Sequence, residues 1–191
     1  MRVISGTARG RRLVSPRDAR VRPTSDRVKE ALFSIITGIL GSFSECVVLD
    51  IFAGTGNLGI EALSRGAARA VFIDNHRESI ALVRKNLELT GFTGKSTILC
   101  RDAVAALKSL EDGGLPFQLV FLDPPYGKDL PGKILEYLAT SPLIGENSLV
   151  VAEFSARDVI GTTFGPLREI DRRTYGDTVL AFYTLTDRGT S

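Results

Sequence analysis

The chain has 191 residues, of which 43% are hydrophobic and 24% charged, and its formal net charge is +2 at pH 7. These values are typical of one globular domain, and they exclude collagen-like, disordered and small disulfide-framework proteins. The sequence holds no apolar run of about 18 residues, and its first residues lack the apolar stretch of a signal peptide. We therefore expect neither a membrane span nor a secretory leader.

Cysteine and histidine are scarce. Cys46 and Cys100 stand among β-branched apolar residues, and His76 is the single histidine. So few cysteine and histidine residues argue against a zinc site and a Ser–His–Asp triad, and we therefore expect no metal. We interpret both cysteines as small buried hydrophobic residues and His76 as a surface or helix-start residue. The expected compartment is the cytoplasm, because thiols stay reduced there.

Positive charge is concentrated at the amino terminus. Residues 1–30 contain nine arginine or lysine residues against three acidic ones, so the rest of the chain is mildly acidic. Such asymmetry is typical of a protein with a polyanionic partner, and the planar arginine fork suits phosphate. Short extended runs on either side of a turn at 7–10 favour an ordered basic hairpin over a solvated tail. The candidate phosphate ligands are Arg9, Arg11, Arg12, Arg22 and Arg27.

Beyond this arm, the pattern alternates between helices and strands. Apolar residues at helical spacing over 28–39 predict a first helix, with Gly38 or Gly41 at its end. Buried strands are predicted at 46–52, 68–74, 96–100, 117–123 and 147–154, and helices at 56–66, 78–91, 103–110 and 130–139. This alternation predicts a parallel sheet with helices on both faces and right-handed crossovers.

The carboxyl-terminal part has a different pattern. Residues 167–185 read as two strands around Tyr175-Gly176-Asp177 with no helix between them, so we expect antiparallel neighbours at one edge of the sheet. No internal repeat or linker interrupts the chain. We therefore interpret 1–191 as a single domain, with a basic arm and helix at 1–40 and a core at 46–186.

A glycine-rich segment joins the first sheet strand to its helix. It carries the spacing Gly-x-Gly-x-x-Gly at Gly54, Gly56 and Gly59, and Asp74 ends the next strand. Both features match the dinucleotide fingerprint, although a tight strand-to-helix turn also requires glycine. Glycines let the backbone approach a ligand, and an acid at a strand end can accept hydrogen bonds from ribose hydroxyls. These features suit both NAD and S-adenosylmethionine.

Asp50, at the end of the first sheet strand, favours S-adenosylmethionine. Its carboxylate would repel the pyrophosphate of NAD, whereas S-adenosylmethionine has no phosphate and carries an ammonium and a sulfonium. Asp102, after the third strand, is placed to accept a hydrogen bond from the adenine amino group. Each acid alone could equally be a surface residue or a helix cap. The candidate cofactor residues are Asp50, Phe52, Ala53, Gly54, Thr55, Gly56, Asp74, Asn75, Asp102, Ala103 and Asp123.

The fourth strand ends in Asp123-Pro124-Pro125-Tyr126. Two prolines cannot continue a sheet ladder, and they remove two backbone donors. The Asp123 carboxylate and the carbonyls of Asp123 and Pro124 remain as acceptors, which suit an exocyclic amino group on a planar ring. Accepting both amino hydrogens directs the nitrogen lone pair at the methyl-sulfonium carbon, and Tyr126 offers a face for base stacking. We take these four residues as the catalytic candidates.

Three segments together resemble the RsmD family of 16S ribosomal RNA guanine-N2 methyltransferases, within the class I S-adenosylmethionine-dependent enzymes. They are 22–33, 50–61 and 123–126, and Tyr175-Gly-Asp-Thr178 is similar to the family's carboxyl-terminal hairpin. The resemblance implies a Rossmann-like α/β fold, with a seven-stranded, mostly parallel sheet whose last strand is antiparallel. It also implies S-adenosylmethionine bound near Asp50, Gly54, Gly56, Asp74 and Asp102. The implied reaction is methylation of a guanine 2-amino group in small-subunit rRNA, on a partly assembled subunit.

Other functions remain open from the residues alone. Another amino-group methyltransferase, acting on DNA adenine N6 or protein glutamine N5, would use a similar Asp-Pro-Pro-Tyr segment. The core uses most of the chain, which leaves little for a DNA-recognition domain, whereas a structured RNA with a splayed base fits a short basic arm. A nicotinamide dehydrogenase and a non-catalytic RNA-binding module both leave the Asp-Pro-Pro-Tyr segment unexplained.

Overall fold

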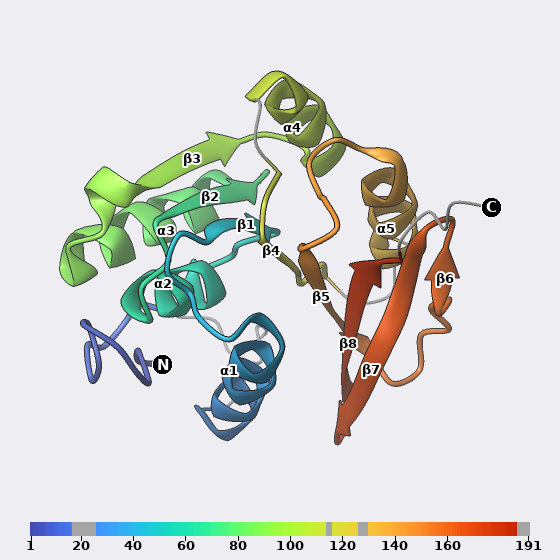
Figure 1. Cartoon of the computed structure of the whole chain (residues 1–191). Helices are drawn as coiled ribbons and strands as arrows, with labels where there is room; N and C mark the ends of the chain where they lie inside the picture. Colours follow the sequence, from blue (N-terminus) through green and yellow to red (C-terminus); the bar gives the residue numbers. More distant parts are fainter. Residues whose placement is uncertain (17–25, 114–115, 126–129, 187–191) are drawn as a thin grey trace.

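One mixed sheet runs through the protein, with helices on both of its faces (Figure 1). The computed structural model describes residues 1–16, 26–113, 116–125 and 130–186. The strands in these ranges are β1 Val47–Ile51, β2 Arg69–Asp74, β3 Ser96–Cys100, β4 Leu119–Leu122, β5 Leu149–Ser155, β6 Thr163–Phe164, β7 Leu167–Tyr175 and β8 Thr178–Leu185. The helices are α1 Asp26–Leu40, α2 Asn57–Ser64, α3 Arg77–Thr90, α4 Ala103–Leu110 and α5 Leu130–Thr140, with short 3₁₀ turns η1 Thr93–Lys95 and η2 Glu111–Gly113.

The strand order is β3-β2-β1-β4-β5-β8-β7-β6. Strands β1 to β5 are parallel, while β8 is antiparallel to both β5 and β7. The expected α/β class and the antiparallel last strand are therefore confirmed. The described sheet has eight strands where seven were expected, because the two-residue β6 pairs with β7 at the edge. Strand β8 consequently lies inside the sheet, with β5 on one side and β7 on the other.

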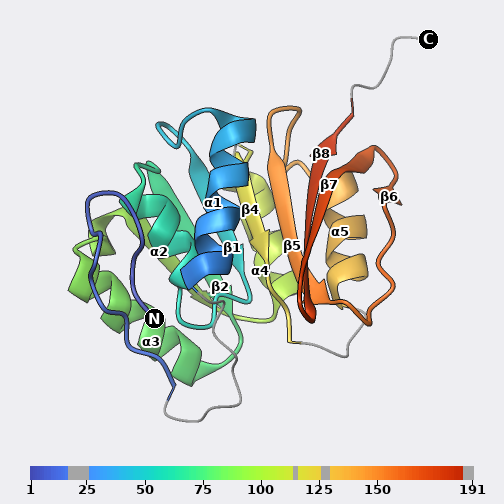
Figure 2. The same cartoon turned by 90° about the horizontal axis from the view of Figure 1, so that it is seen from below.

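Two apolar cores fill the space between the sheet and its helices. The first includes Leu32, Phe33 and Ile36 of α1 together with buried residues of α2 and α3. The second includes Leu107 of α4 and Leu135 of α5 and lies on the opposite face. Because helices cover both faces, the central strands are continuous apolar runs, and β4 is buried along its whole length. Figure 2 shows α1 against the strands on one face and α4 and α5 behind them.

Glycines in the left-handed region end two of the predicted helices. Helix α1 continues through Gly38 and ends before Gly41, which has φ +72°, so Gly38 was wrong as a stop and Gly41 was right. Helix α3 ends at Gly91, whose φ is 80°. A residue without Cβ adopts this conformation without steric cost, which explains why both helices end there.

The two cysteines differ in exposure. Cys46 is buried, as expected, but Cys100 is exposed, because it lies at the end of the edge strand β3. None of the helices in the described ranges combines the length and apolar character that a bilayer crossing requires.

The amino-terminal arm, residues 1–16, is ordered and docks on α2. Its two halves pair through a single bridge between Arg2 and Arg12, so the expected hairpin forms with one bridge in place of two full strands. The Ile4 and Ser5 amides donate to the Glu61 carboxylate at 2.8 and 3.0 Å. Further along the arm, backbone groups of residues 5–8 bond Ser64 at the end of α2.

Helix α2 is buried at all eight of its residues, and Gly59 allows it to pack closely against the sheet. A Cβ at this position would lie 2.4 Å from Phe72 Cε1 of β2 and 3.0 Å from Asp50 Oδ2 of β1. The Gly59 amide donates to the same Asp50 oxygen at 2.9 Å. The third glycine of the motif is therefore required by helix–strand packing.

We predict that Gly59→Ala destabilises the protein, by roughly 1–3 kcal/mol or more, because the new methyl group overpacks the contact with Phe72. Gly38→Ala is the matched control, since a Cβ there meets nothing within 4 Å and alanine favours a helix. Denaturant unfolding of both variants measures the effect. Equal stabilities of Gly59→Ala and the wild type would contradict the packing argument.

Candidate active site

The candidate site lies where the strand order reverses, at the carboxyl ends of β1 and β4. The two strands are parallel neighbours, and the chain leaves β1 toward α2 and β4 toward α5, which cover opposite faces. In open α/β sheets, ligands bind at this kind of switch point. The end of β1, where the loop begins, contacts Asp123 after β4, because the Asp123 amide donates to the Ile51 carbonyl at 3.4 Å.

The loop from Phe52 to Gly56 is a tight turn. Phe52, Gly54 and Gly56 have φ values of 64°, 56° and 75°, and the Gly56 amide donates to the Ala53 carbonyl at 2.7 Å. Positive φ is strained for phenylalanine, and such strain is concentrated at ligand sites. A Cβ at Gly54 would meet only the Phe52 carbonyl, at 4.0 Å, so this side of the loop is open to a ligand.

Asp74 ties the glycine loop to the start of α3. One oxygen accepts a hydrogen bond from the Gly54 amide at 3.0 Å, and the other accepts from the His76 amide at 2.8 Å. The side chain is buried, while Asn75 is exposed beside it. His76 stands at the helix start, as expected. These two hydrogen bonds hold the carboxylate in place. Each oxygen keeps a further lone pair, so Asp74 can still accept hydrogen bonds from hydroxyl groups.

Asp50 is buried beneath the loop and is 2% exposed. Burial raises the pKa of Asp50 to about 7, the Gly59 hydrogen bond opposes this shift, and the nearby Asp74 charge adds to it. The carboxyl group therefore has two functions: it accepts the Gly59 amide hydrogen and it supplies partial negative charge under the loop.

Asp102 is a helix cap. Its Oδ1 accepts hydrogen bonds from the Val104 and Ala105 amides at 3.0 and 3.2 Å, which satisfies the start of α4. The side chain is exposed and Ala103 is buried beside it. The carboxylate nevertheless lies at the same edge as Asp74, because the Arg101 amide donates to the Asp74 carbonyl at 3.1 Å.

The Asp-Pro-Pro segment follows β4 without a break. Asp123 is half-buried, Pro124 is buried and Pro125 is exposed, while Tyr126 lies outside the described residues. Burial raises the pKa of Asp123 well above its usual range, and the carboxylates of Glu153 and then Asp50 raise it further. Three acids from three strands thus influence one another at this edge.

Glu153 is a site residue that the sequence reasoning missed. It lies in β5, is 7% exposed, and follows Ala152, the register partner of Leu122. The signal was a charged residue within the apolar run of β5. Its position beside Asp123 depends on the β4–β5 register, which periodicity alone does not reveal.

Two further buried polar residues connect the arm to the glycine loop. Asn86 donates to the Val14 and Thr55 carbonyls at 3.0 and 2.9 Å and accepts from the Val14 amide at 2.7 Å. Lys29 donates to the Arg2 carbonyl at 2.6 Å and to Asn57 Oδ1 at 2.8 Å. The sequence did not indicate the hydrogen bonds of either residue, because both residues stand within ordinary amphipathic helices.

A polar groove of about 720 Å³ lies between the arm, α1 and the end of α2. Its lining includes Arg2, Arg9, Arg27 and Arg65, together with Asp26 and Glu30. Arg11 and Arg12 are exposed on the same arm, whereas Arg22 lies outside the described residues. The groove therefore brings together Arg9 and Arg27, two of the five expected phosphate ligands, and it adds Arg2 and Arg65.

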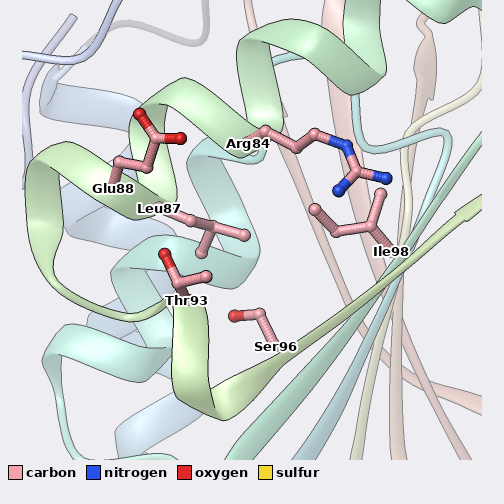
Figure 3. A pocket seen from close by; sticks show the side chains of 6 residues that line it. All are labelled: Arg84, Leu87, Glu88, Thr93, Ser96 and Ile98. Atoms are coloured by element: carbon pink, nitrogen blue, oxygen red, sulfur yellow. The ribbon is translucent and has the colours of Figure 1, made fainter.

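A second hollow, of about 190 Å³, lies between α3, η1 and β3 (Figure 3). Thr93 and Ser96, which line it, stand before and at the first residue of β3. This places the hollow at the amino edge of the parallel strands, opposite the glycine loop. It is therefore not part of the candidate site.

Comparisons with known proteins agree with this geometry. The family model described as Conserved hypothetical protein 95 matches residues 1–184. YlbH of Bacillus subtilis (strain 168) is 36% identical over 183 residues, covering 96% of this chain and 98% of that protein. "Ribosomal RNA small subunit methyltransferase D" of Escherichia coli (strain K12) is 34% identical over 162 residues, covering 85% and 78% of the two chains.

A solved structure, yhhF from Escherichia coli, has a TM-score of 0.84 and 30% identity, and the match covers 98% of this chain and 99% of that one. Sequence and structure thus match relatives of the same kind over nearly the full length. The chain belongs to the family described as Conserved hypothetical protein 95, the RsmD family of methyltransferases.

Proposed function

We propose that this protein transfers a methyl group from S-adenosylmethionine to the exocyclic N2 of a guanine in small-subunit rRNA. The observation that carries the proposal is the meeting of the glycine loop and Asp123 across the β1–β4 pair. A methyl donor held by the loop and an amine held by Asp123 would face each other at this edge. The enzyme is an S-adenosylmethionine-dependent rRNA methyltransferase, as its family membership indicates.

The residues at the edge fit this cofactor. Gly54 leaves an open approach to the loop backbone, and Asp74 is held with lone pairs to spare for ribose hydroxyls. Asp50 lies buried beneath the loop, where the positive charge of the ligand would favour its ionised form, and Phe52, Ala53, Thr55 and Gly56 shape the loop beside it. Asn75, Asp102 and Ala103 would border the adenine. When bound, S-adenosylmethionine supplies the electrophilic methyl group.

Asp123 and Pro124 would hold the target amine. Pro124 and Pro125 have no amide hydrogens, so this segment offers the amine backbone acceptors without backbone donors. Acceptance of both amino hydrogens by Asp123 and Pro124 would turn the nitrogen lone pair toward the donor, and alignment for in-line attack supplies much of the rate. Asp123 would then take up the released proton, and Tyr126 would stack on the base.

The arm and its groove would bind the rRNA. Arg9, Arg11, Arg12, Arg22 and Arg27 are the proposed phosphate ligands, joined by Arg65 from the groove. Their contacts would carry affinity, whereas the base would be chosen at the strand ends. We propose a partly assembled small subunit as the substrate and the cytoplasm as the compartment, because ribosomal subunits are assembled there.

We predict that Asp123→Ala lowers methyl transfer at least about 100-fold, because the amine loses its main acceptor. Cofactor binding remains, since the loop does not depend on Asp123. Transfer is measured with labelled cofactor on undermodified small subunits, followed by nucleoside mass spectrometry, and binding by calorimetry. Asp112→Asn, exposed on η2, is the control. Full activity of Asp123→Ala would overturn the catalytic role.

We predict that activity rises with pH through the raised pKa of Asp123, because only the ionised carboxylate can take up the proton that the amine releases. Asp50→Asn removes one of the charges that raise this pKa, so the rising limb moves to lower pH. The asparagine oxygen can still accept the Gly59 amide hydrogen. The pH profile of kcat under saturating substrate tests the shift, and a limb that stays in place or moves to higher pH would contradict it.

We predict that replacing Arg9, Arg11 and Arg12 together by alanine weakens RNA binding and flattens its salt dependence. Each lost phosphate contact reduces the slope of log K against log salt by roughly 0.7–0.9, so three contacts account for roughly 2–3 units. Arg168→Ala is the control, because this exposed arginine lies on β7, which is separated by β8, β5 and β4 from the strands that α2 covers. An unchanged slope in the triple variant would exclude the arm from the interface.

A further inference from the structure

We propose that Asn86 is a positioning residue through which RNA binding by the arm and cofactor binding by the glycine loop strengthen each other. Asn86 lies on α3 and is fully buried. The inference rests on the proposed function and adds regulation to the same site, because the cofactor is then held most tightly when the RNA is in place.

Asn86 holds the arm by its backbone. Its Oδ1 accepts a hydrogen bond from the Val14 amide at 2.7 Å, and its Nδ2 donates to the Val14 carbonyl at 3.0 Å. The Val14 side chain is exposed, so these backbone bonds contribute more than apolar burial to the docking of this part of the arm. Val14 follows Arg12, which pairs with Arg2, by two residues. The proposed phosphate ligands and the docking point therefore belong to one short segment.

The same side chain holds the glycine loop. Asn86 Nδ2 also donates to the Thr55 carbonyl at 2.9 Å. This carbonyl shares a peptide group with the Gly56 amide, which donates to the Ala53 carbonyl at 2.7 Å. The peptide group is therefore fixed at both ends, between Gly54 and Gly56, which both have positive φ. Replacement of Asn86 frees one end of a peptide group in the loop that would hold the cofactor.

Both proposed ligands favour the docked arrangement. The contact between arm and loop is either made or broken, and a ligand shifts such an equilibrium by its preference for one of the two arrangements. The cofactor needs the loop in the shape that Asn86 fixes. The RNA needs the docked arm, because one strand must reach the arm arginines and the strand ends at once. By linkage, each ligand then raises the affinity for the other by the same factor.

A second connection between arm and loop, through Lys29, serves the fold. Lys29 bonds the Arg2 carbonyl and Asn57, and it also forms an ion pair with the buried Glu61 at 3.2 Å. Its removal would leave a buried charge without its partner, which is strongly destabilising. Asn86 is neutral, so its truncation leaves no buried charge. Asn86 is therefore the residue at which coupling can be separated from folding.

The test measures the affinity for labelled S-adenosylhomocysteine by equilibrium dialysis, with and without saturating undermodified small subunits. This ligand has no methyl group to transfer, so binding is measured without turnover. We expect the subunits to tighten its binding to the wild type at least about fivefold. Saturating S-adenosylhomocysteine should tighten binding of the subunits by the same factor.

We expect Asn86→Ala to bring this factor close to one. In the steady state the loss raises KM for S-adenosylmethionine and leaves kcat unchanged, because Asn86 touches no reacting atom. Ser148→Ala is the matched control. Ser148 is also buried, donates to the Phe117 carbonyl at 2.6 Å and accepts from the Gly145 amide at 2.8 Å, just before β5 and away from the arm and the loop. It should keep the wild-type factor despite its lost hydrogen bonds.

Val14→Pro tests the same contact from the arm, because proline has no amide hydrogen to donate to Asn86. It should also lower the factor, and it decides the question if Asn86→Ala does not fold. Equal cofactor affinity of the wild type with and without subunits would overturn the coupling, and so would a variant that weakens cofactor binding equally in both conditions. Either outcome leaves the proposed function intact. A wild type that binds no cofactor, or methylates no guanine, would overturn the proposed function itself.

Discussion

The fold depends on one buried carboxylate. Glu61, fully buried in α2, accepts hydrogen bonds from the Ile4 and Ser5 amides, and it forms ion pairs with Lys29 at 3.2 Å and Arg65 at 2.9 Å. A buried charge is compatible with a stable fold only when oppositely charged and hydrogen-bonding groups surround it, and removal of one such group strongly destabilises the protein. The arm, α1 and α2 must therefore assemble as one unit, although they are far apart in sequence.

This unit also positions half of the candidate active site. Lys29 bonds Asn57 at the first residue of α2, and Asn86 bonds Thr55 within the glycine loop, so side chains of α1 and α3 hold the loop and the start of α2 in place. The other half comes from β4 and β5, whose register brings Asp123 beside Glu153. One half is held by side-chain hydrogen bonds and the other by a strand ladder, and they meet at the β1–β4 pair.

Whether a feature could be predicted from the sequence depends on how far apart in the sequence its interacting residues lie. The strands of the parallel sheet and the glycine loop were predictable, because their patterns are local and the central strands are buried on both faces. The two-residue strand β6 is too short to show periodicity, and Gly38 showed that a helix can continue through glycine. Glu153 and Asn86 could not be placed, because their roles arise from a cross-strand register and a contact between residues 72 positions apart.

The arm docks on the body largely through its backbone. The amides of Ile4, Ser5, Thr7 and Ala8 make the contacts to α2, while the Arg9, Arg11 and Arg12 side chains are exposed. Surface side chains of this kind can be exchanged with little effect on folding. The arm can thus diverge in composition during evolution without unfolding the enzyme, so the RNA contacts proposed for it can change while the fold of the body stays the same.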